Sequence, residues 1–587
     1  MTLANFAAPV RTQQLHETLR DNAGRPVPAT CVYRTDDIAG TVRACFARGE
    51  AVLMVGSLTS ATGNFELEIW RPHPAVAGCA VVGIQPLSLA VDASGDVLPT
   101  QPALHGDPDD VLRSDRIALH LHREGTDRHT IQAGAGVTLA QINRALREFF
   151  AADEYFDYCV PVDLTTIDSA QVGAVYATGA QGPSRFRISD VARRVTLCND
   201  EALTRLGDAA SIAAHEGLWG MTGAVVDLEL RVYRRPKHRF GFFIPLVRSA
   251  TGNWIDQVAA VLALLRDATT LTLQDGALSS GWANGVIDGA EVVARETLEL
   301  VANTKLPAGP NRQVAQRVLA LMQAREKSGG YRSQSDFGVY LTGNARFSEL
   351  DGFLDDADSP LARLLEYAEH SERFLHADGM TTVIDDMRGL EDMRLLREAF
   401  ADIARQYAKH REPGQGKPFS ESTDINCSID PQAAAAMSVD QLREQFRWIL
   451  QPYYAYEMRI RDLAEVARAH GASVTLCRYG HLNPRSTNLH TRVTVHAPEG
   501  SIAAPVLVQV VQRARDNLLA VLKDLSERHA AIRAEGGEQG KMTADAWHLM
   551  TAAQRDEAVA LLAAADPRWQ AHLKGHWARA VQAARKL

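Results

Sequence analysis

The sequence predicts an α+β protein with more than one domain, and three observations lead to this fold class. At 587 residues the chain is too long for a single hydrophobic core. Over the first 235 residues, short strands end repeatedly in loops of small residues. After residue 237, longer amphipathic helices alternate with strands. We therefore expect an N-terminal arm at 1–29, a first domain at 30–235, a second domain at 236–540 and a helical C-terminal segment at 541–587.

Charge and composition exclude several classes of function. The formal net charge is −9 and the isoelectric point is near 6.1, so we expect no basic surface for nucleic acid. No apolar run approaches the ~20 residues of a membrane-spanning helix, and residues 1–10 lack the features of a signal peptide. The seven cysteines are scattered singly, as is typical of reduced thiols, and we expect Cys159 to be an inert core residue. These features predict a cytoplasmic protein.

The first loop of small residues follows a helix and a strand. Helical spacing of apolar side chains predicts a helix at 36–48, and the apolar run at 51–55 predicts a strand that ends at Gly56. The loop at 56–63 is small and hydroxylated, so its backbone N–H groups could approach a pyrophosphate closely. A surface turn of the same composition is the alternative interpretation.

Later segments repeat this arrangement. Residues 129–134 predict a strand, and Thr138 is suited to be the N-cap of a helix from Leu139 to Phe150. Small residues recur at 171–182, where the backbone must come close to a flat group or to another backbone.

The remaining periodicity divides into strands and long helices. Alternating apolar residues predict strands at 191–197 and 223–233, and the polar stretch at 409–422 predicts a surface loop. Amphipathic spacing predicts the following helices: 254–265, 361–375, 393–407, 503–534 and 544–586.

Four segments, in this order, resemble the FAD-binding domain of the vanillyl-alcohol oxidase superfamily, also called PCMH-type. They are residues 56–63, 134–139, 160–163 with 173–182, and 216–222. The resemblance implies a two-lobed FAD-binding domain followed by an α+β substrate (cap) domain. It places the pyrophosphate on the first loop and the flavin near Pro161 and Gly173. The cofactor-binding residues that it implies are Gly56, Ser57, Leu58, Thr59, Ser60, Gly63, Pro161, Gly173, Ala177, Thr178, Gly182, Glu216 and Gly220. We expect non-covalent FAD, because the Gly56 loop contains no His or Cys.

The C-terminal half resembles the D-lactate and D-2-hydroxyglutarate dehydrogenases. Residues 479–490 are similar to their G-H-x-G-D-G-N-L-H segment, with two residues inserted between the histidines, and residues 532–537 to their I-S-x-E-H-G segment. The resemblance implies that His481, His490 and Glu535 hold a divalent metal such as Zn²⁺ or Mn²⁺. The alternative is that the insertion moves His481 out of reach, so that His490 alone faces the flavin.

Arg397 is similar to the substrate-binding arginine of the same group. Its guanidinium could hold a carboxylate through a bidentate pair, although a solvated arginine on a helix face is the alternative. Ser422 replaces the family's lysine, which argues against a dicarboxylate substrate. The resemblance implies that His490, or a metal-bound oxygen, takes the hydroxyl proton of a D-2-hydroxy acid while a hydride passes to flavin N5.

Two other functions stay open. One is an oxidase of a specialised biosynthetic pathway that acts on an amine, alcohol or modified amino acid, with O₂ as the electron acceptor in place of a quinone or an electron-transfer protein. The other is a non-catalytic subunit that keeps the fold and serves assembly. In each catalytic case the partner is a small-molecule substrate, and we allow for a homodimer.

Overall fold

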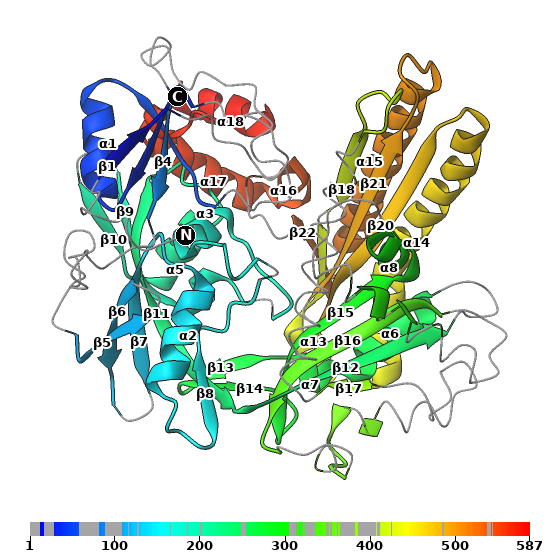
Figure 1. Cartoon of the computed structure of the whole chain (residues 1–587), viewed down its shortest axis with the longest axis horizontal. Helices are drawn as coiled ribbons and strands as arrows, with labels where there is room; N and C mark the ends of the chain where they lie inside the picture. Colours follow the sequence, from blue (N-terminus) through cyan, green and yellow to red (C-terminus); the bar gives the residue numbers. More distant parts are fainter. Residues whose placement is uncertain are drawn as a thin grey trace.

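The computed structural model describes most of the chain. The described residues are 12–16, 29–57, 81–87, 108–114, 117–125, 128–164, 166–184, 186–199, 202–247, 254–303, 313, 315–317, 319–320, 323, 335–347, 352, 355–360, 362–363, 382–384, 407, 411–423, 425–483, 486–536, 542, 544–573 and 575–586. In Figure 1 the elements of the first 236 residues lie together with the C-terminal helices and with β13 and β14, and the other elements form a second body beside them.

The first domain opens with a small sheet in the order β1-β2-β4-β3. Its strands are β1 (Thr12–Leu15), β2 (Cys31–Thr35), β3 (Ala51–Met54) and β4 (Val81–Pro86). Strands β2 and β3 both run parallel to β4, and helix α1 (Ile38–Ala47) makes the crossover between them. The helix and strand expected before Gly56 are therefore confirmed.

A larger antiparallel sheet follows, in the order β10-β9-β11-β7-β6-β5. Its strands are β5 (Asp110–Ser114), β6 (Ile117–Arg123), β7 (His129–Gly134), β9 (Ala192–Cys198), β10 (Leu203–Leu206) and β11 (Ala224–Pro236). Two further strands, β8 (Phe156–Cys159) and β14 (Ala277–Ser279), pair with the end of β11. Strand β13 (Thr272–Gln274) pairs with β14. The strands expected at 129–134, 191–197 and 223–233 correspond to β7, β9 and β11. All three predictions are confirmed.

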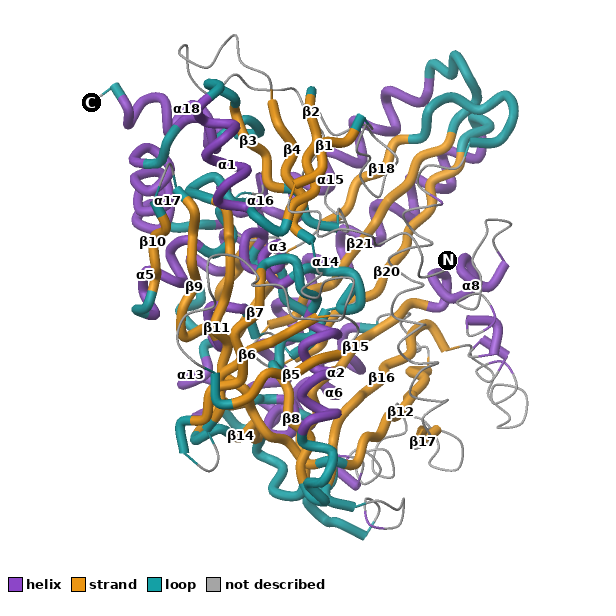
Figure 2. Tube along the Cα trace, turned by 60° about the vertical axis from the view of Figure 1, so that its left-hand side comes forward, coloured by secondary structure: helices purple, strands orange, loops and turns teal. Residues whose placement is uncertain are grey.

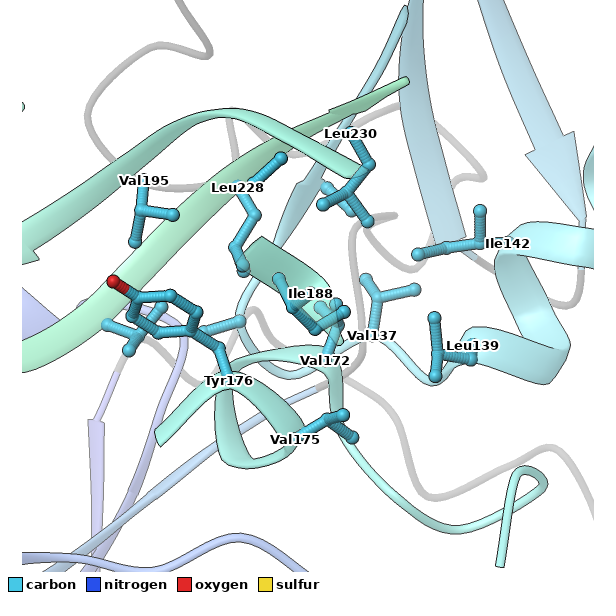
Figure 3. Close-up of a cluster of buried hydrophobic side chains, with 14 of the residues drawn as sticks. Val137, Leu139, Ile142, Val172, Val175, Tyr176, Ile188, Val195, Leu228 and Leu230 are labelled. Carbon is cyan, nitrogen blue, oxygen red and sulfur yellow. The ribbon is translucent and has the colours of Figure 1, made fainter. Parts of the chain in front are cut away.

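Four short helices pack on this sheet. They are α2 (Leu139–Phe149), α3 (Val172–Thr178), α4 (Ile188–Val191) and α5 (Ala209–His215). As expected, Thr138 caps α2: its hydroxyl accepts the Gln141 N–H, and the Gln141 side chain accepts the Thr138 N–H. Figure 3 shows side chains of α2, α3, α4, β9 and β11 meeting in one buried cluster, so α3 is anchored on its inner side by the core.

The second domain is built on one antiparallel sheet, in the order β17-β12-β16-β15-β20-β21-β19-β22, with β18 paired to β21 (Figure 2). Its strands are β12 (His238–Val247), β15 (Gly285–Ala294), β16 (Ser335–Ala345), β17 (Thr382–Ile384), β18 (Phe419–Thr423), β19 (Ile425–Ile429), β20 (Ser473–Asn483), β21 (Ser486–His496) and β22 (Ile532–Gly536). The helices are α6 (Ile255–Leu264), α7 (Arg266–Thr269), α8 (Arg295–Asn303), α13 (Pro431–Ala436), α14 (Val439–Ala469) and α15 (Ala503–Arg528). The core lies between one face of the sheet and the helices α6, α14 and α15.

Two expectations for this domain are wrong in part. The surface loop expected at 409–422 includes strand β18, and the helix expected at 503–534 ends at Arg528, before strand β22. In both places pairing with distant strands, β21 and β19, overrides the local pattern. The helix at 254–265 is confirmed as α6. The helices expected at 361–375 and 393–407 lie almost entirely outside the described residues.

The C-terminal elements pack back onto the first domain. They are α16 (Ala544–Leu549), α17 (Ala552–Ala564), the 3₁₀ turn η4 (Pro567–Trp569) and α18 (Gly575–Arg585). Trp569 is buried against Phe46 of α1, and the Arg568 guanidinium donates to the Phe46 carbonyl. Turn η4 also contacts β3, the strand that leads to Gly56. The last residues of the chain therefore complete the core around that strand.

Two further features bear on the expectations from composition. Cys159 is buried, as expected for a core residue, and burial raises the pKa of its thiol to about 11, which disfavours the reactive thiolate. In the part of the chain that the structure describes, no helix has the length and apolarity needed to span a membrane.

Candidate functional site

The glycine-containing segments of the first domain meet at helix α3. The Gly173 N–H donates to the Ala135 carbonyl at 3.0 Å, and the Val172 N–H donates to the Val137 carbonyl at 2.7 Å. A Cβ atom at Gly173 would lie 2.6 Å from the Cβ of Ala135 and 3.1 Å from its backbone. This contact requires glycine, because any larger side chain would force the two segments apart.

The Gly56 segment lies against the same helix. A Cβ atom at Gly56 would lie 2.6 Å from the Cβ of Ala174, in the first turn of α3. The Gln85 amide donates to the Gly56 carbonyl at 3.3 Å, and the Gln171 amide donates to the Pro86 carbonyl at 2.9 Å. The end of β3, the end of β4 and the start of α3 are thereby joined.

The fourth segment closes over the other end of α3. The Gly217 N–H donates to the Tyr176 carbonyl at 3.1 Å, and the Trp219 N–H donates to the Ala177 carbonyl at 2.6 Å. Gly217, Trp219 and Gly220 have φ values of 77°, 53° and 70°, a left-handed turn that favours glycine. Glu216 is buried at the base of this turn.

The carboxylate of Glu216 accepts the N–H and the hydroxyl of Ser189. Burial raises the pKa of Glu216, although Arg187 and these hydrogen bonds oppose the shift.

The third segment is folded back on itself. Gly182 lies so close to the Asp163 carbonyl that a Cβ atom would overlap its oxygen, and the Ser184 hydroxyl donates to the Pro161 carbonyl at 3.0 Å. All four segments therefore converge around α3. We call this arrangement the cradle; it consists of residues 56–57, 134–139, 160–163, 171–184 and 216–222.

The structure places most of the expected cofactor-binding residues in the cradle. They are Gly56, Ser57, Pro161, Gly173, Ala177, Thr178, Gly182, Glu216 and Gly220. Leu58, Thr59, Ser60 and Gly63 lie outside the described residues. The Thr178 hydroxyl donates to the Ala174 carbonyl of its own helix, so its hydrogen is already used.

Sequence reasoning missed two glutamines of the cradle. Gln171 and Gln181 are 7% and 4% exposed, yet Gln171 Oε1 and Gln181 Nε2 have no hydrogen-bond partner among the described residues. Buried amide groups are rarely left in this state, so a polar ligand at this position would satisfy both. The residues present therefore suit a group such as FAD. The sequence does offer a signal, because the two glutamines flank a run that is otherwise small or apolar, apart from Tyr176.

The two domains meet beside the cradle. Arg235 at the end of β11 pairs with Asp157 of β8 at 3.2 Å and with Asp288 of β15 at 2.8 Å. A Cβ atom at Gly289 of β15 would lie 3.7 Å from the Cβ of Pro183. The cradle therefore adjoins the face of the second sheet to which Gly289 contributes.

That face carries polar side chains. Alternate residues of β20 join the core under the helices, so Tyr479 and His481 project from the opposite face. The same alternation in β15, β21 and β19 places Glu291, His490 and Asn426 on this opposite face. We call these five residues the polar face.

The two histidines lie together in spite of the inserted residues. Strands β20 and β21 form a hairpin in which Tyr479 pairs with His490 and His481 pairs with Asn488. The ring centroids of His481 and His490 are 5.3 Å apart, and those of Tyr479 and His490 are 5.0 Å apart. The two rings are therefore within contact distance of each other despite the insertion.

The carboxylate that engages His481 is Glu291. Nδ1 of His481 lies 2.6 Å from Oε1 of Glu291. Within the described residues, no group of three His, Cys, Asp or Glu side chains could hold a metal. Glu535 lies in β22, three strands from β20, and its side chain is not among those described. The expected ligand set is therefore not found in the described part of the chain, and Arg397 lies outside it.

Charged side chains support β20 from behind, and two of them, Arg478 and Glu457, are buried. Arg478 projects toward the helices, where it pairs with Glu457 of α14 and with Glu296 of α8. Its N–H donates to the Thr297 hydroxyl at 2.7 Å. Burial opposes ionisation of Glu296, but Arg478 and Arg461 lower its pKa overall. This network fixes the strand that carries Tyr479 and His481 on its other side.

Comparison with known proteins identifies the fold. No protein-family model and no curated protein matches the chain. A solved structure of alkyldihydroxyacetonephosphate synthase is similar with a TM-score of 0.53 at 10% identity, covering 93% of this chain and 76% of that one. A second structure of that synthase has a TM-score of 0.49 at 10% identity, covering 84% and 75%.

The likeness shows the fold. The expected α+β fold class is confirmed, because the fold is similar to that of alkyldihydroxyacetonephosphate synthase. At 10% identity the likeness decides neither substrate nor subgroup.

Proposed function

We propose that this chain is an FAD-dependent oxidoreductase that oxidises a small polar substrate at the polar face. The observation that carries the proposal is the position of the cradle beside two buried imidazoles. A dinucleotide needs close backbone approach, which the Gly56 and Gly173 contacts allow. The likeness of the fold to that of an enzyme, alkyldihydroxyacetonephosphate synthase, is compatible with catalysis on this fold.

In this proposal the cradle holds FAD without a covalent bond. Bound FAD would accept a hydride from the substrate. The unpartnered amide atoms of Gln171 and Gln181 would pair with polar atoms of the cofactor. The residues of the loop at 58–63 remain expected contacts.

The substrate that we propose is a D-2-hydroxy acid. His490 is the candidate base for the hydroxyl proton, since it lies on the polar face between Tyr479 and His481. Glu291 holds the neighbouring imidazole of His481 in one orientation. Arg397 stays the candidate partner of the substrate carboxylate. The electron acceptor is a quinone or an electron-transfer protein, and an oxidase that uses O₂ is the competing proposal.

The test is to purify the protein and mix it anaerobically with a panel of substrates. We expect a yellow protein that releases FAD on denaturation, and bleaching of the flavin by a D-2-hydroxy monocarboxylic acid such as D-lactate but not by its L isomer. Colourless protein that does not take up FAD would contradict the flavoprotein assignment. Bleaching only by an amine, an alcohol or a dihydroxyacetone phosphate derivative would replace the hydroxy acid and keep the flavin.

A further inference from the structure

Asn426 is buried on the polar face with an unsatisfied side chain. It is 1% exposed, and neither its Oδ1 nor its Nδ2 has a hydrogen-bond partner among the described residues. Its neighbours Ile425 and Cys427 face the other way, into the core beneath the sheet. The amide is therefore held by its strand at a fixed place on the face that adjoins the cradle.

A buried amide without hydrogen bonds indicates a binding site for a ligand. Burying a polar group without hydrogen bonds is costly, and the great majority of buried polar side-chain atoms have a partner. An apolar side chain of the same size would avoid this cost at no loss of packing. A site that keeps asparagine under these conditions is typical of a binding site whose ligand completes the hydrogen bonds.

The register of the sheet places Asn426 in one row with two other residues of the polar face, Glu291 and His481. Glu291 pairs with His481, and His481 pairs with Asn488 on the next strand. Asn488 pairs in turn with Asn426, which pairs with Glu535. One row thus crosses five strands, with the imidazole of His481 at its second position and the unsatisfied amide at its fourth.

The row is linked to the cradle at both ends. At the β15 end, Gly289, two residues before Glu291, faces Pro183. At the β22 end, the link is indirect: helix α16 contacts the strand, and its Trp547 packs against the cluster that contains Leu218 and Met221. A substrate bound above the row would therefore lie on the face of the second sheet that adjoins the cradle.

We propose that Asn426 is a substrate-binding residue that selects 2-hydroxy acids; this inference rests on the proposed function. An asparagine amide offers two donors and one acceptor oxygen. A 2-hydroxy acid presents a carboxylate, which accepts from Nδ2, and a hydroxyl, which donates to Oδ1. Oxidation to the 2-oxo acid removes that donor, so the product loses one hydrogen bond and is released more readily.

The experiment compares two variants of the full-length holoenzyme. Asn426→Leu replaces the amide by an apolar side chain with the same branching. The matched control is Thr487→Val, because Thr487 is also buried with an unpartnered hydroxyl but lies on the helix side of the same sheet. Melting temperature without substrate, flavin content, and kcat and KM for D-lactate and D-2-hydroxyglutarate are measured for both.

We expect Asn426→Leu to raise the melting temperature by about 1–3 °C, because a buried unsatisfied group is removed. With flavin content unchanged, kcat/KM should fall about 30- to 100-fold, mainly through KM, as two hydrogen bonds to substrate are lost. Thr487→Val should raise the melting temperature and leave kcat/KM within about twofold.

Different outcomes separate this inference from the function on which it rests. If the wild-type flavin is reduced and Asn426→Leu retains its kcat/KM, the role of Asn426 is overturned while the proposed function stands. A fall in melting temperature for Asn426→Leu would likewise show that the amide is satisfied within the protein. If no 2-hydroxy acid reduces the wild-type flavin, the proposed function fails, and this inference fails with it.

Discussion

Nδ1 of His481 lies 2.6 Å from Oε1 of Glu291, although the two residues are 190 positions apart in the chain and lie on the neighbouring strands β20 and β15. Both side chains are almost fully buried. A carboxylate in this position fixes the orientation of the imidazole ring, because it favours a proton on the nitrogen that faces it. The ring of His490, the candidate base, packs edge-on against that imidazole.

Glu291 should therefore act as a positioning residue. We expect Glu291→Ala to lower kcat about 10- to 100-fold with little change in KM, since the imidazoles would lose their alignment while substrate binding persists. Glu291→Gln, which keeps an oxygen acceptor, should recover part of this loss. Steady-state kinetics at full flavin loading would measure both. Equal kcat values in the wild type and both variants would show that the pair of Glu291 and His481 has only a structural role.

Gly173→Val tests the cradle. The added side chain would overlap Ala135, so the segments around α3 must separate and FAD should be lost. The ratio of flavin to protein absorbance after purification measures how much FAD the variant retains. Gly207→Ala is the control, because a Cβ atom there meets nothing within 4 Å and flavin content should not change. Full flavin content in Gly173→Val would argue against the cofactor site.

Trp569→Ala tests the contribution of the C-terminal residues to the first domain. The indole is 1% exposed, and its centroid lies 5.1 Å from that of Phe46. Its removal should cost about 3–5 kcal/mol of unfolding free energy and loosen β3, so FAD should dissociate more readily. Denaturant titration with parallel flavin fluorescence would follow both effects. Trp448→Ala, at a site 36% exposed, should change neither by a comparable amount.

Glu216 makes stability depend on pH. Burial raises its pKa in the folded state, so its contribution is fully present below the ordinary pKa of a glutamate and is lost as the pH rises through the raised value. Glu216→Gln stays neutral and removes this dependence. As the pH rises from about 4 to about 8, the melting temperature of the variant should therefore increase relative to that of the wild type. A constant difference in melting temperature between the two proteins across this pH range would contradict a raised pKa for Glu216.

The metal expectation is tested by His490→Ala. Because Glu291 already engages His481, we expect the holoenzyme to turn over in the presence of chelators. The variant should then lose about 10²- to 10⁴-fold in rate through lost proton transfer and keep its FAD. Elemental analysis of both proteins is the second measurement. If the wild type contains about one divalent ion per chain and the variant contains none, the metal site formed by His481, His490 and Glu535 would be supported after all.

Local patterns predicted much of the first domain. The apolar spacing before Gly56, the N-cap at Thr138 and the alternation in β11 each concern a few neighbouring residues, and each was found where expected. The position of β18 was not predicted, because its pairing with β21 depends on residues about seventy positions away. The same holds for β22, which continues the helical pattern of α15 in sequence but pairs with β19.

The sequence by itself determined the fold class and the glycines that let four segments approach one another. These features depend on local periodicity and on the absence of side chains, both of which can be read along the chain. Only the tertiary structure decided that Glu291 faces His481, that the amide of Asn426 is buried in the same row with no hydrogen bond from the described residues, and that Trp569 packs under α1. The physical reason is that strand register and long-range burial bring together residues whose separation in sequence carries no periodic signal.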